Sequence, residues 1–185
     1  MALKDAILAA LLDGESWGYD LAKGFDASVA NFWSATPQQL YRELERMESE
    51  GLVRAQVVQQ ERRPNKRLFS LTEAGHRALR DFTRMPTRPT ALRDELLVKV
   101  QAVDDGDPAA VRTAVDARLA LAQQRLARYE RARERLLDGG SEEDYLARAP
   151  RVGPYLTLLR GIAFENENAR WAELTIRVLD GRGTD

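Results

Sequence analysis

The sequence predicts a mainly α-helical chain with a two-stranded β-hairpin near residue 60 and an all-helical second half. Apolar residues recur at steps of three and four through most of the chain, which is the period of an amphipathic helix. Between residues 52 and 71 the pattern becomes that of short strands. Residues 83–89 contain Pro86 and Pro89, so we predict a first domain at 1–85 and a second at 86–185.

Three helices are expected before the hairpin. The first covers residues 2–12, and the second follows Ser16 as its cap and carries Leu21, Phe25 and Val29 on one face. Thr36-Pro37 is a typical helix start, and it predicts a third helix over residues 37–50 that ends at Gly51. Leu40, Leu44 and Met47 form the apolar stripe of this third helix.

The hairpin and the helix after it complete the element order of a known type of domain. Residues 52–59 and 66–71 are predicted strands, residues 61–65 the turn, and Thr72 the cap of a fourth helix. Three helices, a two-stranded wing and a further helix are the order of a winged helix-turn-helix domain.

The second half predicts helices at 92–100, 108–138 and 153–179. The stripe of the second of these helices consists of Val111, Val115, Leu119, Ala122, Leu126, Tyr129 and Leu136. The two long helices would each extend about 40–45 Å at 1.5 Å per residue. A small domain cannot cover such stripes from one side, so we predict a helical dimerisation domain and a homodimer.

Composition restricts the chemistry. The chain has no cysteine and a single histidine, His76, which excludes disulfides, thiolate zinc sites and histidine clusters. The sequence has no nucleophile elbow, phosphate loop or dinucleotide fingerprint, so we predict a protein that is not an enzyme and has no cofactor or metal. The sequence also has no signal-peptide pattern and no apolar run long enough to span a membrane. We therefore predict a cytoplasmic protein without membrane contact.

Several stretches resemble the PadR family of bacterial transcriptional regulators. Residues 16–21, SWGYDL, resemble the start of that family's second helix, although Ser16-Trp17 replaces the usual residues before Gly-Tyr. Residues 41–53, YRELERMESEGLV, resemble its recognition helix, and residues 67–75, RLFSLTEAG, its second wing strand. The second half resembles the long form of the family, whose helical region is named after virulence activators. The resemblance implies a DNA-binding regulator, a contacting or packing role for Tyr41, and half-sites of the ATGT/ACAT kind.

The predicted DNA contacts lie in two places. A recognition helix presents its N-terminal residues to base edges, where glutamine suits adenine and arginine suits guanine or phosphate. The wing carries four cations in six residues, and such a tip contacts the backbone or the minor groove. Net charge is −1, and residues 1–88 have 13 Lys/Arg against 12 Asp/Glu, so the basic surface must be a local patch. The predicted DNA-contacting residues are Ser34, Thr36, Gln38, Gln39, Tyr41, Arg42, Arg62, Arg63, Lys66 and Arg67.

A small aromatic effector is a further expectation. Aromatic and amide side chains that could surround a flat ligand between the two domains are Phe32, Trp33, Tyr155, Asn166, Asn168 and Trp171. Ordinary core and dimer packing is the alternative for each of them. The function predicted is a homodimeric repressor on a palindromic operator in double-stranded DNA, with ligand-induced release left open. A winged-helix module for protein assembly and a ligand-sequestering protein are the alternatives.

Overall fold

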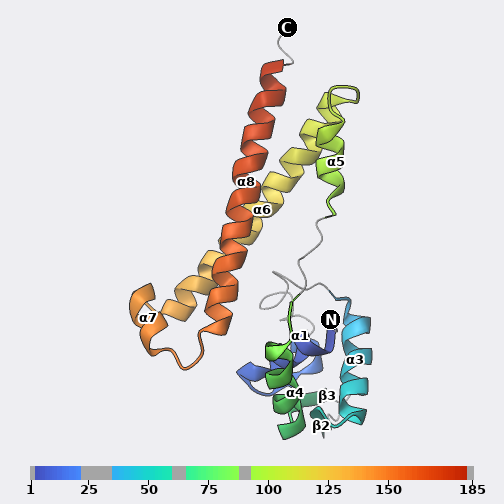
Figure 1. Cartoon of the computed structure of the whole chain (residues 1–185), viewed down its shortest axis with the longest axis vertical. Helices are drawn as coiled ribbons and strands as arrows, with labels where there is room; N and C mark the ends of the chain where they lie inside the picture. The colour runs from blue at the N-terminus through green and yellow to red at the C-terminus, as the bar shows by residue number, and fades with distance from the viewer. Residues whose placement is uncertain (1–2, 22–34, 60–65, 88–92, 183–185) are drawn as a thin grey trace. The chain divides into compact units, whose positions relative to one another are not determined.

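The computed structural model of the 185-residue chain describes residues 3–21, 35–59, 66–87 and 93–182. The chain divides into two compact units, Met1–Arg88 and Pro89–Asp185 (Figure 1). The protein is mostly helical, with one small antiparallel sheet in the first unit. None of the helices in the described ranges is long and apolar enough to cross a membrane.

The first unit combines short helices with a three-stranded sheet. Its elements are α1 (Leu3–Ala10), η1 (Leu11–Asp13), β1 (Ser16–Trp17), α3 (Pro37–Ser49), β2 (Val53–Val58), β3 (Lys66–Leu71) and α4 (Glu73–Arg84). The strand order is β1-β3-β2 and both pairings are antiparallel. The wing strands pair from Val53 opposite Leu71 to Val58 opposite Lys66, which confirms the predicted hairpin.

The third strand was not predicted. Ser16 and Trp17 pair with Phe69 and Leu68 of β3, so Ser16 belongs to a strand and not to the cap of a helix. Helical structure begins after them, at residue 18. A strand of two residues contains too little sequence to show a period, and only its pairing with β3 defines it.

Local contacts and backbone conformation define both ends of helix α3. The Thr36 hydroxyl accepts from the Gln39 backbone N–H at 3.2 Å, while Gln39 Oε1 accepts from the Thr36 N–H at 2.9 Å. This capping box satisfies two N–H groups, and Pro37 fills the first helical position. Gly51 follows the helix with φ +69°, a left-handed conformation that favours glycine. The predicted start is confirmed, and the predicted end is correct to one residue.

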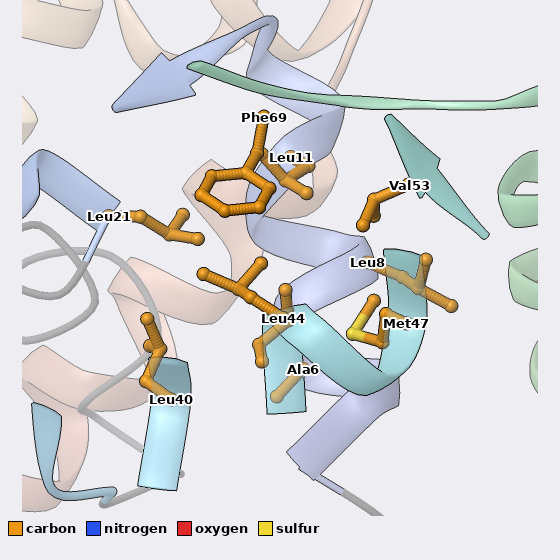
Figure 2. Packing of buried hydrophobic residues seen from close by; sticks show 10 residues of the cluster. Ala6, Leu8, Leu11, Leu21, Leu40, Leu44, Met47, Val53 and Phe69 are labelled. Carbon is orange, nitrogen blue, oxygen red and sulfur yellow. The ribbon is translucent and has the colours of Figure 1, made fainter. Parts of the chain in front are cut away.

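An apolar core holds α3 in place. Leu40, Leu44 and Met47 are fully buried, and Phe69 of β3 lies between Leu11, Leu21 and Leu44 in Figure 2. The buried residues of this core are Ala6, Ile7, Leu8, Leu11, Leu21, Leu40, Leu44, Met47, Val53 and Phe69. No charged side chain is buried in the described part of this unit. Burial of each large aliphatic side chain stabilises the unit by about 1.5–3 kcal/mol.

Gly75 allows α4 to approach the wing closely. The Thr72 hydroxyl caps α4 by accepting from the Gly75 N–H at 3.1 Å, and it donates toward the Leu52 carbonyl oxygen at 3.0 Å. A Cβ on Gly75 would lie 2.2 Å from that same carbonyl oxygen. The first turn of α4 therefore packs against the start of β2 through a site that only glycine fits.

The second unit is built on two long helices. Its elements are α5 (Glu95–Gln101), α6 (Pro108–Leu137), α7 (Glu142–Arg148) and α8 (Gly153–Arg182). Helices α6 and α8 have 30 residues each and pack against one another (Figure 1). The expected long helices are confirmed, whereas the seven-residue α7 was not predicted. Val111, Val115, Ala122 and Tyr129 of the predicted stripe are buried, but Leu136 is exposed, which corrects that part of the prediction.

Candidate nucleic-acid interface

Gln38 and Arg42 lie on the side of α3 that faces away from its buried stripe. We call this side the crest of α3. At 100° per residue these positions lie within about 20° of directly opposite Leu40, the first residue of the buried stripe. Both side chains are exposed, and so are Pro37 and Gln39 in the first turn of the helix. Their amide and guanidinium groups can pair with adenine and guanine edges respectively. The apolar core therefore presents these two side chains outward on the part of α3 that a recognition helix offers to DNA.

Thr36 and Gln39 form the cap of α3 at the same end. Their side chains form the capping box, so Gln39 Oε1 is already occupied by a backbone N–H. The Gln39 amide nitrogen and the exposed Thr36 side chain remain at the surface. Gln39 can therefore donate to a DNA acceptor but cannot make the two-way contact with adenine without opening the cap. Ser34, the other predicted contact at this end, lies outside the described residues.

Charge along α3 changes from its first half to its second. Arg42 has no ion pair among the described residues, whereas Arg46 pairs with Glu43 at 2.6 Å and with Glu50 at 3.7 Å. Glu45 and Glu48 make the second half acidic. Phosphates repel carboxylates, so this distribution favours contact through the N-terminal turns of α3 alone.

Tyr41 lies on the flank of α3 against the start of the preceding helix. A Cβ on Gly18 would come within 2.9 Å of Tyr41 Cε1 and 3.2 Å of Phe69 Cε2, so the Gly-Tyr pair of the sequence leaves room for the Tyr41 ring. Tyr41 is 40% exposed. It borders an open cavity of about 300 Å³, whose walls are formed by Trp17, Gly18, Tyr19, Asp20, Tyr41, Lys66 and Arg67.

Of the four predicted wing cations, the structure describes Lys66 and Arg67. The Lys66 ammonium lies 5.6 Å from the centre of the Trp17 ring. Arg67 makes an ion pair with Glu48 of α3, and its guanidinium lies 5.1 Å from the Phe69 ring centre. Arg62 and Arg63, the two remaining predicted wing cations, lie outside the described residues. Sequence analysis missed Trp17 and Glu48, because neither partner is close to its cation in the sequence.

The predicted effector residues of the second unit lie in different environments. Tyr155 is fully buried, and its hydroxyl donates to Glu142 Oε2 at 2.7 Å and accepts from Arg133 Nε at 3.2 Å. Burial raises the pKa of Tyr155, while the hydrogen bond from Tyr155 and that from Arg133 lower the pKa of Glu142. Tyr155 thus joins α7 to the two long helices. Phe32 and Trp33 lie outside the described residues.

Among the other candidates, only Asn168 contacts a buried carboxylate. Glu165 of α8 is 3% exposed, and it pairs with Arg125 of α6 at 2.9 Å. Asn168 donates to Glu165 Oε2 at 3.0 Å, whereas Asn166 is exposed. Trp171 is half-buried against the core formed around Val115 and Ala172. The sequence did not indicate that Glu165 is buried, because an isolated glutamate on a long helix is usually solvated.

Comparison with known proteins places both units. The description "Transcriptional regulator PadR-like family" matches residues 7–81, and "Virulence activator alpha C-term" matches residues 92–180. A Mycobacterium tuberculosis protein named "Probable transcriptional regulator Rv1176c" is 36% identical over 183 residues, which cover 94% of this chain and 95% of that protein. The chain belongs to the PadR-like family of transcriptional regulators.

Other members show how far the likeness extends. The negative transcriptional regulator PadR of Bacillus subtilis is 28% identical, with 96% of this chain and 97% of that protein covered. Its crystal structure with operator DNA gives a TM-score of 0.74 at 26% identity, covering 96% and 98% of the two chains. Its complex with p-coumaric acid gives 0.69 at 25% identity, covering 96% and 95%. This PadR-like chain is therefore a winged-helix transcriptional regulator and not an enzyme.

Proposed function

We propose that this PadR-like regulator is a homodimeric repressor that reads a palindromic operator through α3 and the wing. The observation that carries the proposal is the crest of α3, where Gln38 and Arg42 are exposed opposite a fully buried apolar stripe. Exposed Thr36, Gln39 and Tyr41 surround this crest, and Lys66 lies at the start of β3. The Bacillus subtilis relative, whose structure holds operator DNA, supports DNA binding by this chain.

The second unit supports dimerisation through a second apolar stripe. Leu156, Phe164, Leu174 and Val178 of α8 are all exposed, at 43–53%. At 100° per residue they lie within an arc of about 80°, on the side opposite the buried residues Leu158 and Ala172. Half-buried Trp171 lies in the same arc. Another copy of this chain would cover this stripe and place two recognition helices on one duplex.

An aromatic carboxylate is the effector class that we propose. The support is the Bacillus subtilis relative, whose structure holds p-coumaric acid. In this chain Trp171 offers a half-buried aromatic surface, and Asn168 carries an amide next to Glu165. Binding of such a ligand would lower DNA affinity if it stabilises a dimer geometry that does not fit the operator.

Fluorescence anisotropy tests the proposal. The full-length protein is titrated onto the DNA upstream of its own gene and onto a scrambled duplex, at two salt concentrations. We expect a preference of tenfold or more, equal to about 1.4 kcal/mol. The double variant Gln38→Ala, Arg42→Ala should remove most of that preference, whereas the control Ser49→Ala, on the same crest near the end of the helix, should keep it.

Three other results would redirect the proposal. Equal, steeply salt-dependent binding to both duplexes would mean that this operator is not in the tested DNA, and a genomic selection would then decide. Failure to bind either duplex would contradict DNA reading by α3 and favour the assembly module. Addition of p-coumaric acid to the complex should lower the affinity, and an unchanged affinity would exclude this acid as the effector.

A further inference from the structure

The two basic residues at the start of β3 have different surroundings. In an antiparallel sheet, neighbouring residues of one strand point to opposite faces. Trp17 pairs with Leu68, so Lys66 shares a face with the Trp17 ring. Arg67 shares the other face with Phe69, whose ring is buried in the core beneath α3. The alternation of β3 therefore separates two cations that the sequence places side by side.

Arg67 is engaged on the protein side. Its Nη2 pairs with Glu48 Oε2 near the C-terminal end of α3, and both side chains are 36% exposed. The guanidinium also lies above the Phe69 ring. The ion pair joins residues 19 positions apart, one on the recognition helix and one on the wing. No other ion pair between α3 and the wing strands occurs in the described part of the chain.

Lys66 has a different partner. Its ammonium faces the Trp17 ring at 5.6 Å, and it has no ion pair with a carboxylate in the described segments. A contact with an aromatic face orients the ammonium but does not neutralise its charge. Lys66 therefore keeps a full positive charge at the surface, whereas the charge of Arg67 is balanced by Glu48.

We propose that Arg67 and Glu48 form a positioning pair that sets the wing against the recognition helix, and that Lys66, oriented by Trp17, is the DNA-phosphate contact of β3. The division rests on the proposed function, because it assigns roles within the same DNA-reading surface. The sequence placed Arg67 and Lys66 together among the DNA contacts. The Arg67–Glu48 pair gives Arg67 a role in operator preference through the geometry of the wing and not through its charge.

The dependence of affinity on salt separates the two roles. Each phosphate neutralised by a cation contributes about 0.9 to the slope of log affinity against log salt. Lys66→Gln should therefore weaken binding to operator and scrambled duplex alike and reduce the slope by about 0.9 per protomer. Arg67→Gln should leave the slope unchanged and lower the ratio of operator to scrambled affinity by about fivefold.

Glu48 gives the sharper test because its charge predicts the opposite result. A carboxylate that merely lies near DNA repels phosphate, so Glu48→Gln would strengthen binding if Glu48 had no other role. We expect Glu48→Gln to lower operator preference as Arg67→Gln does. The reversed pair, Glu48→Arg with Arg67→Glu, keeps the net charge and should recover part of the preference that each single reversal loses. Glu45→Gln is the matched control, since Glu45 is exposed on the same helix without an ion pair among the described residues.

Hydrogen exchange of the free protein gives a readout that does not need DNA. Glu48→Gln and Arg67→Gln should each speed exchange of the amides of β2 and β3, and Lys66→Gln should not. A salt slope reduced by Arg67→Gln, with stronger binding by Glu48→Gln, would overturn the proposal. Unchanged exchange in both variants would also overturn it. Wild-type protein without operator preference, but with faster exchange in the two variants, would instead contradict the proposed function and leave the positioning pair standing.

Discussion

The two units of this regulator bury their apolar surface in different ways. The first unit closes its core: ten apolar residues, from α1, η1, α3, the sheet and position 21, are buried, and no charged residue is buried among those described there. The second unit leaves exposed apolar residues along α8 and buries a carboxylate, Glu165, against α6. The described part of the first unit therefore buries its core within one copy, whereas the second leaves an apolar stripe that the homodimer we propose would cover.

Polar contacts have matching roles in the two units. In the second unit Asp94 pairs with Arg118, Glu165 with Arg125, and Glu142 with Arg133, and each pair joins different helices or the cap of one helix to the side of another. Two long helices with similar stripes can slide by a turn, and paired buried or half-buried charges disfavour such shifts. In the first unit the pair of Arg67 and Glu48 joins β3 to α3.

A side chain at Gly75 should give the largest loss of stability. Gly75→Ala places a Cβ 2.2 Å from the Leu52 carbonyl oxygen, which is backbone and cannot move without displacing α4 or β2. We expect the free energy of unfolding of the first unit to fall by about 3 kcal/mol or more. Denaturant unfolding of the full chain, with hydrogen exchange of α4 and the wing strands, measures the loss.

The control uses the same substitution where space is open. Gly153→Ala, at the start of α8, meets no atom within 4 Å and should leave stability unchanged or raise it by up to about 1 kcal/mol. Equal stability of the Gly75→Ala and Gly153→Ala proteins would show that the close approach of α4 is not required.

Charged substitutions in the exposed apolar stripe of α8 should weaken self-association without unfolding the chain. Leu174→Lys with Val178→Lys places two charges in the exposed arc of α8, where burial against a second copy would desolvate them. We expect self-association at least tenfold weaker by analytical ultracentrifugation, and an unchanged circular dichroism spectrum at high protein concentration. Glu173→Lys, a neighbouring exposed position outside the arc, is the control. A variant that still forms a dimer of wild-type strength would place the interface elsewhere.

Lowering the pH should reduce the stability of the second unit by a smaller amount. The hydrogen bond from Arg118 lowers the pKa of Asp94 in the folded state. A lowered folded pKa contributes stability that is fully present above the unfolded value of about 3.9 and is lost as pH falls through the folded pKa. Between pH 5 and pH 3 we expect Asp94→Asn to lose less stability than the wild type, by at most about 1 kcal/mol.

The asparagine at position 94 can still accept from the Leu96 N–H that caps α5, so the difference reports the charge alone. Glu142 titrates in both proteins and cancels in the comparison. Asp105→Asn, which removes an exposed carboxylate, is the control. Parallel pH profiles for wild type and Asp94→Asn would show that the Asp94–Arg118 pair does not stabilise the fold.

The sequence by itself determined the elements with strong local signals. Thr36-Pro37 and Gly51 define α3, because a capping hydroxyl, a missing N–H and a left-handed glycine act within a few residues. The alternation in residues 66–71 predicted β3, and the apolar period predicted the two long helices. The crest of α3 also followed, since the buried stripe of a helix defines the opposite side.

Only the tertiary structure decided features that depend on pairing between distant segments. Strand β1 exists through two residue pairs with β3, and α7 is held by the contact of Tyr155 with Glu142. Lys66 and Arg67 look alike in the sequence, yet Trp17 orients one and Glu48 neutralises the other. Glu165 is buried, and its ion-pair partner, Arg125, comes from another helix. A local pattern carries no information about a partner that folding brings from 19 or 40 residues away.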